Sequence, residues 1–134
     1  MTTRVFLVIA LVFCGCGSNP LELDNRELSN MLSLANQARR PIQDPADPSR
    51  IIGLAVEVDV INVGNLTIDV PFTMTWSLLD GQGKLHGSAS QRLDGILVPG
   101  ASRHVLLTLS FPAIPSLEGF QDAVTFDLVP QSSN

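Results

Sequence analysis

From residue 50 onward, apolar and polar side chains alternate along the chain with a period of two. In the first such stretch every second residue from Ile52 to Val60 is apolar, and Glu57 and Asp59 fall on the opposite face. Because successive side chains of a strand point to opposite sides, this pattern predicts a strand with one buried and one solvated face. The two carboxylates are interpreted as part of the solvated face, since nothing in the sequence separates their pKa values as an acid/base pair requires.

The same alternation recurs in three further stretches, and residues 80–84 (DGQGK) between two of them are a hairpin signal followed by a weaker strand. The residues predicted to point inward are Val70, Phe72, Met74, Trp76 and Leu78, then Val105, Leu107, Leu109 and Phe111, then Val124, Phe126 and Leu128. Strands with one apolar face bury these faces against each other. The pattern predicts an all-β fold, an antiparallel immunoglobulin-like β-sandwich of about six to seven strands over residues 50–130.

Residues 16–49 precede this pattern and are expected to hold a tether, a short helix and a loop. Apolar residues recur at helical spacing over residues 25–38, and the alternative is an irregular strand over residues 19–24 followed by a loop. Residues 41–49 contain three prolines and two aspartates, which predicts a loop. Asp44 and Asp47 are interpreted as turn residues, because a calcium site needs about six to eight oxygen ligands.

The only two cysteines of the chain, Cys14 and Cys16, lie at the end of an apolar run near the N terminus. The run covers residues 5–14 and follows Arg4. As a helix it would rise about 15 Å, half of the roughly 30 Å hydrocarbon core of a bilayer. A positive start, a short apolar stretch and then small residues are typical of a signal peptide. Metal binding is disfavoured, since two thiolates alone do not complete a tetrahedral zinc site.

The stretch FCGCGSN resembles the signal of a bacterial lipoprotein, in which the signal peptide is cut before a cysteine whose thiol is then lipidated. The resemblance implies that residues 1–15 are the signal peptide, that cleavage falls between Gly15 and Cys16, and that Cys16 is lipidated. The chain departs from the family pattern at Phe13, where Leu is usual, and at Cys14, where Ala or Ser is usual. Plain secretion with cleavage elsewhere is the alternative.

A lipidated Cys16 leaves the exported domain without an internal disulfide, so its stability must come from an ordinary apolar core. Gly17 follows the cysteine, where lipoproteins retained in the inner membrane of enteric bacteria often have Asp. The resemblance therefore implies an outer-membrane location facing the periplasm.

A second resemblance covers roughly residues 50–129. The strand that ends in Asn62 and Gly64, the aromatic-led strand 72–78, the hairpin and the turn 99–102 are similar to those of CARDB-type cell-adhesion domains. They are also similar to the water-stress domains of desiccation-related proteins. Both resemblances imply a non-catalytic role, and neither transfers a catalytic residue.

The net charge and the types of side chain present argue against several classes of function. The exported part carries thirteen acidic and seven basic residues, a net charge of −6, which argues against nucleic acid as a partner. His86 and His104 are interpreted as isolated surface residues, and we predict no metal site, cofactor or catalytic residues. We expect a membrane-anchored envelope lipoprotein, not an enzyme, that interacts with or supports another envelope protein. The alternative is a small-ligand or glycan binder using the loops 62–65, 80–84 and 98–102.

Overall fold

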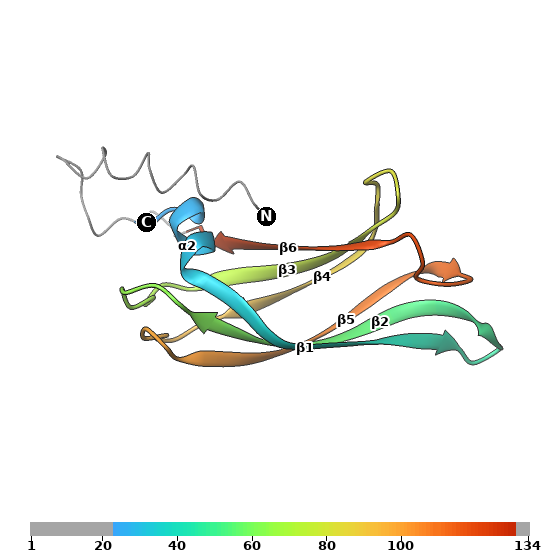
Figure 1. The fold of residues 1–134 in the computed structure, drawn as a ribbon, viewed down its shortest axis with the longest axis horizontal. Coiled ribbons are helices and arrows are strands. Elements are labelled where there is room, and N and C mark those ends of the chain that lie inside the picture. Colours follow the sequence, from blue (N-terminus) through green and yellow to red (C-terminus); the bar gives the residue numbers. More distant parts are fainter. Residues whose placement is uncertain (1–22, 131–134) are drawn as a thin grey trace.

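The protein is an antiparallel β-sandwich of two three-stranded sheets (Figure 1). The computed structural model describes residues 23–130. One sheet has the order β1-β2-β5, made of β1 (Leu32–Asp44), β2 (Asp47–Asn62) and β5 (Ser102–Ile114). The other has the order β4-β3-β6, made of β4 (Leu85–Leu93), β3 (Phe72–Leu79) and β6 (Gln121–Leu128). The predicted all-β sandwich is therefore confirmed. The predicted signal peptide, Cys16 and the first part of the tether lie outside the described residues.

The core lies where the apolar faces of the two sheets meet. β3 alternates strictly between buried and half-buried residues, and Trp76 at its centre is 1% exposed, which confirms it as a core residue. The predicted inward residues of β5 are also all buried. In β6 the predicted inward residue Phe126 is buried, whereas Val124 and Leu128 are half-buried, because β6 is an edge strand.

The two sheets meet differently along their two long sides. On one side β4 and β5 are in contact across the layers. On the other side lie the edge strands β1 and β6, and the helix α2 (Asn25–Met31) contacts both. Leu28 of α2 is completely buried and belongs to the core. The helix therefore closes one end of this side of the sandwich.

The helix begins as its sequence predicts but ends earlier. Asp24 is the N-cap, with its side chain accepting from the Glu27 backbone N–H while the Glu27 side chain accepts from the Asp24 N–H. The expectation of a helix over residues 25–38 is wrong beyond Met31, because the chain turns into β1 at Leu32 and pairs with β2. Pairing with a long neighbouring strand outweighs a helical spacing of alanines, since propensity is a weak preference that tertiary contacts override.

The loop predicted over residues 41–49 is also wrong. β1 continues to Asp44 and β2 starts at Asp47, so only a tight turn separates the two strands. Asp44 accepts from the N–H of Ala46, and Asp47 accepts from the N–H and hydroxyl of Ser49. Pro41 is tolerated because an edge strand leaves one row of N–H positions unpaired. The sandwich thus begins at Leu32, ahead of the boundary expected at residue 50.

One buried polar residue organises the loops at the end of the sandwich where α2 lies. The side chain of Asn62, at 0% exposure, donates to the carbonyls of Leu66 and Leu97 at 2.8 and 2.9 Å. Its Oδ1 accepts from the Gly64 N–H at 2.9 Å. A Cβ on Gly64 would lie 2.9 Å from Cγ of Met31, so any larger residue there would have to displace the Met31 side chain. The Asn-x-Gly sequence is therefore a structural clamp between two loops and the helix.

Candidate functional site

A groove of about 580 Å³ opens between the edge strands β1 and β6, beside α2. Its apolar lining comes from Leu32, Leu34, Val124 and Phe126. Its polar lining comes from Asn25, Arg26, Ser29, Ser33, Gln37, Thr125 and Asp127. The groove exists because the inward faces of β1 and β6 are not covered by a further strand on this side of the sandwich.

Helix α2 fixes the end of β6 that borders the groove. Asn25 Oδ1 accepts from the backbone N–H of Leu128 at 2.7 Å, and Asn25 Nδ2 donates to Asp127 at 3.3 Å. The Leu128 N–H therefore points away from β3, towards the open edge. Because the backbone of a strand alternates, the N–H groups of Phe126 and Val124 point to the same edge.

An ion pair joins the two edge strands next to the groove. Arg39 of β1 binds Asp122 of β6 with two nitrogen–oxygen distances of 2.8 Å, a bidentate geometry. This pair lies on both strands just beyond the residues that line the groove. The groove is therefore bounded by α2 on one side and by an ion pair on the other.

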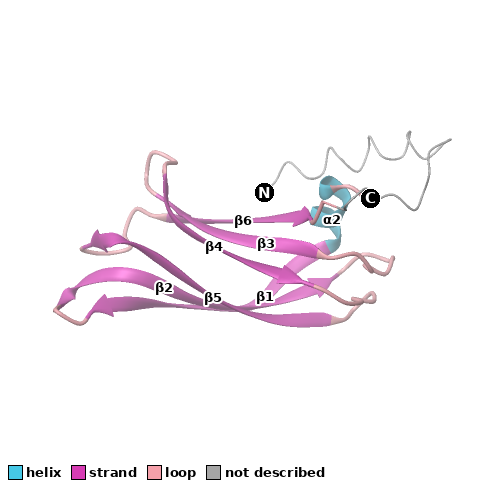
Figure 2. Ribbon diagram, turned by 180° about the vertical axis from the view of Figure 1, so that it is seen from behind, coloured by secondary structure: helices cyan, strands magenta, loops and turns pink. Residues whose placement is uncertain are grey.

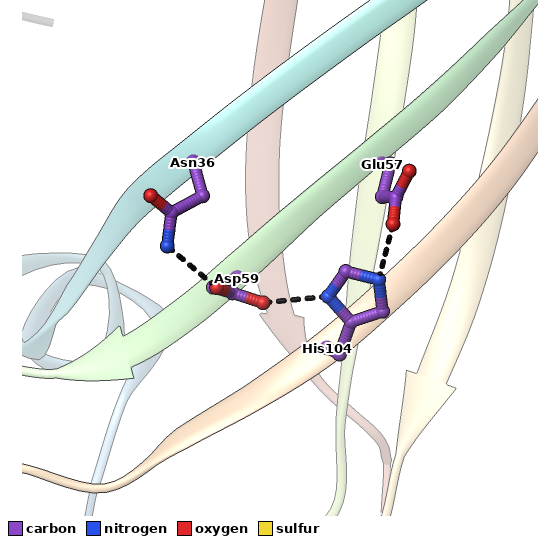
Figure 3. A network of polar contacts seen from close by, with 4 residues as sticks. All are labelled: Asn36, Glu57, Asp59 and His104. Atoms are coloured by element: carbon purple, nitrogen blue, oxygen red, sulfur yellow. Dashed lines mark hydrogen bonds and ion pairs between the residues drawn. The ribbon is translucent and has the colours of Figure 1, made fainter.

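Besides the groove and its ion pair, a cluster of polar side chains lies on the outer face of the β1-β2-β5 sheet (Figure 3). The register of β2 and β5 places Asp59 opposite His104. His104 Nδ1 lies 2.6 Å from Asp59 Oδ1, and Nε2 lies 2.8 Å from Glu57 Oε2. Asn36 of β1 donates to the other oxygen of Asp59 at 2.8 Å. The cluster thus links all three strands of the sheet. We name it the His104 network: Asn36, Glu57, Asp59 and His104.

The electrostatics of the His104 network favour a charged imidazolium. Hydrogen bonds to Asp59 and then to Glu57 raise the pKa of His104 above its usual value. Hydrogen bonds from His104 and then from Asn36 lower the pKa of Asp59. Each ring nitrogen faces a carboxylate oxygen, so both donate when the ring is protonated, and neither is left as a base for a substrate. The arrangement supports a role in holding strands together.

The His104 network should stabilise the fold only over a limited pH range. The raised His104 pKa gives a contribution that is complete below about pH 6.5 and is lost as the pH rises through the folded-state value. The lowered pKa of Asp59 gives a second stabilising contribution, which is fully present above about pH 3.8 and is lost as the pH falls through the folded-state pKa of Asp59. We expect His104→Ala to lower the urea midpoint slightly at about pH 5.5, and less at about pH 9. The effect is small since the groups are exposed.

The matched control for this measurement is Thr108→Ala, which changes another exposed residue of β5 and should show no such pH dependence. If His104→Ala lowers the urea midpoint equally at both pH values, the ring stabilises the fold through packing alone.

The sequence interpretation of the two histidines as isolated surface residues needs correction. His104 points outward as predicted, but it is bonded to two carboxylates. His86 of β4 is half-buried, with its ring centroid 5.4 Å from that of Phe111 and 5.1 Å from that of Phe120. The sequence shows each of these residues on a face, but it does not show which strands pair, and so the His104 network could not be predicted.

The other candidate residues are distributed over the molecule. The loops 62–65 and 98–102 lie together at the end of the sandwich where α2 lies, whereas the hairpin 80–84 lies at the opposite end (Figures 1 and 2). These three loops do not form one surface. Asp44 and Asp47 hold their own turn, and the bonds from Ser49 lower the pKa of Asp47. Within residues 23–130 no group of three or more His, Cys, Asp and Glu residues has the geometry of a metal site.

No protein family and no curated protein sequence matches the chain. It is similar to two solved structures, a structural genomics target called SoR45 and a candidate ApaA protein from Bordetella pertussis. The first is 13% identical, covers 77% of this chain and 90% of its own, and has a TM-score of 0.41. The second is 15% identical, covers 75% and 95%, and has a TM-score of 0.38. In residues 23–130, no helix is both long enough and apolar enough to cross a bilayer.

Proposed function

We propose that this protein is a lipid-anchored protein of the bacterial cell envelope whose non-catalytic sandwich binds another envelope protein. The anchor is supported by the short apolar N-terminal stretch that ends at Gly15 and Cys16. Gly17 in place of Asp supports an outer-membrane location facing the periplasm. Acyl chains on Cys16 would hold the domain at the membrane surface, because several chains together give stable anchoring.

The groove between β1 and β6 is the observation that carries the binding role. It joins an apolar lining to a strand edge whose N–H groups at Val124 and Phe126 point outward. An extended segment of a partner can add to such an edge through main-chain hydrogen bonds and place alternate side chains in the groove. The groove therefore fits an extended peptide segment with apolar residues at every second position.

The polar rim sets the orientation of that segment. Arg26 and Asp127 bring opposite charges to the groove, and Gln37 and Ser33 add neutral hydrogen-bonding groups. Such rim contacts position a partner and select against wrong ones more than they add affinity. The His104 network, on the outer face of the β1-β2-β5 sheet, keeps its ring nitrogens on carboxylates. This supports the proposal that the domain binds without catalysing a reaction.

The binding role can be tested by photo-crosslinking in intact cells. A benzoylphenylalanine at Gln37, an exposed residue of the groove, should crosslink to one recurrent envelope protein identified by mass spectrometry. The same group at Gln91, an exposed residue of the edge strand β4 on the other long side, should not. The crosslink from Gln37 should fall to background when Ser33→Arg blocks the groove without entering the core.

Equal crosslinking from Gln37 and Gln91, or a crosslink that persists in Ser33→Arg, would show that the groove is not the binding site. The melting temperature of Ser33→Arg serves as the control for folding, because the Ser33 side chain is exposed and its replacement should leave stability within about 0.5 kcal/mol.

A further inference from the structure

Four large apolar side chains are exposed together at one end of the sandwich. Val63 and Leu66 lie in the loop between β2 and β3, each 58% exposed. Ile96 and Val98 lie in the loop between β4 and β5, 67% and 47% exposed. The two loops are adjacent, since Ile68 and Leu97 pair through backbone hydrogen bonds of 2.8 and 3.0 Å. We call these four residues the apolar tip.

The backbone under the apolar tip is firmly held. Asn62 ties the first loop to the second through its bonds to Leu66 and Leu97. The second loop ends in a turn in which the Ala101 N–H donates to the Val98 carbonyl, with Gly100 at φ 86°. Ile96 and Val98 point out while Leu97 between them is 4% exposed. The two tip loops therefore have a defined backbone conformation that exposes apolar side chains.

The apolar tip lies at the end of the molecule where the described chain begins. The Val63 N–H donates to the carbonyl of Met31, the last residue of α2, at 2.7 Å. Figures 1 and 2 both show α2 and the two tip loops at one end, with the hairpin between β3 and β4 at the other. The segment that leads back to Cys16 therefore joins the domain at the tip end.

The length of that segment limits how the domain can stand on a membrane. Cys16 precedes Leu23 by seven positions, and seven extended residues reach at most about 25 Å. The thirteen-residue strand β5 alone spans about 43 Å. A domain held by so short a tether keeps its tip end, where that segment joins it, near the bilayer.

We propose that the apolar tip inserts into the interfacial region of the membrane to which Cys16 is anchored. The inference rests on the proposed lipid anchor, which supplies the membrane and the orientation. Residues 63–68 and 95–100 contain no charged side chain, whereas Asp69 and Asp94 flank them and limit how deeply the loops enter. Exposed apolar patches of this kind mark membrane or protein contacts, and the short tether selects the membrane.

The test uses the absence of other cysteines from the mature chain. Single variants Leu66→Cys and Ile96→Cys are labelled with an environment-sensitive NBD fluorophore in the lipidated protein. They are reconstituted in vesicles of phosphatidylethanolamine and phosphatidylglycerol. Two controls carry the label elsewhere: Gln82→Cys in the exposed far hairpin, and Leu106→Cys, where an exposed leucine lies on the outer sheet face.

The tip labels should shift their emission to the blue and should be quenched by nitroxide-bearing lipids, while both control labels should do neither. Quenching that is the same at all four positions, or absent at the tip, overturns the insertion. A tip label that is protected only when a partner protein is added assigns the surface to protein contact and also overturns it. Mass spectrometry of Cys16 distinguishes failure of the proposed lipid anchor from failure of the proposed insertion. If Cys16 carries no acyl chain, the lipid anchor is rejected. If Cys16 is acylated but the tip labels are not quenched, only the insertion of the tip is rejected.

Discussion

Replacing Cys16 with Ser is expected to abolish acyl labelling and release the protein from membranes. The serine hydroxyl cannot take the place of the thiol that carries the lipid in the lipoprotein family that the N terminus resembles. The effect should be close to complete, because the four residues of the apolar tip offer only a shallow contact with the membrane. The measurement is incorporation of a labelled fatty acid together with fractionation of cell membranes.

The neighbouring cysteine provides the matched control. Cys14 lies in the predicted signal peptide and would be discarded with it, so Cys14→Ser should leave both acylation and membrane association unchanged. The opposite result, in which Cys14 is required and Cys16 is dispensable, would show that Cys14 is the lipidated residue. If neither variant alters membrane association, the lipoprotein interpretation is wrong.

Asn62→Ala is expected to destabilise the folded protein by about 3–5 kcal/mol. The alanine removes three hydrogen bonds made by a fully buried side chain, each with a net value of about 1 kcal/mol. It also removes a partner from the Leu66 carbonyl and the Gly64 N–H in a partly buried region, which adds part of their desolvation cost, whereas the Leu97 carbonyl keeps its bond from the Ile68 N–H. The measurement is urea unfolding of purified protein.

Gln91→Ala is the control for this experiment. Gln91 is exposed and its side chain donates a hydrogen bond to the Arg92 carbonyl, so its loss should cost less than about 1 kcal/mol. If Asn62→Ala lowers the free energy of unfolding by less than about 1 kcal/mol, the proposed role of Asn62 in holding the two loops is contradicted. Water or a rearranged loop would then replace all three hydrogen bonds.

The alternation of apolar residues predicted the sheet faces well. Each residue predicted to point inward in β3 and β5 is buried, apart from half-buried Val70 ahead of β3, because period-two patterning follows directly from the pleat of a strand. The turn at residues 80–84 was also predicted, and Asp80 there accepts from the N–H groups of Gln82 and Lys84. These bonds lower the pKa of Asp80. Such features are local, so neighbouring residues suffice to specify them.

The first strand could not be predicted, because its residues carry no clear alternation. β1 is mostly exposed, and the positions from Ala35 to Ala38 contain an irregularity in the pairing with β2, with Asn36 at φ 53°. A polar, bulged edge strand resembles a loop or a weak helix in sequence. Only the hydrogen bonds offered by the neighbouring edge of β2 decide its conformation.

The sequence by itself determined which faces of the later strands are apolar and that a hairpin turn lies at residues 80–84. The tertiary structure alone decided which strands lie side by side. The pairing of β2 with β5 brings Glu57 and Asp59 to His104, residues that are more than forty positions apart. The separation of β1 from β6 creates the groove, and the meeting of two loops at Asn62 creates the apolar tip. A period of two fixes the side on which a residue points, but the choice of partner strand depends on contacts between distant segments, which local pattern does not encode.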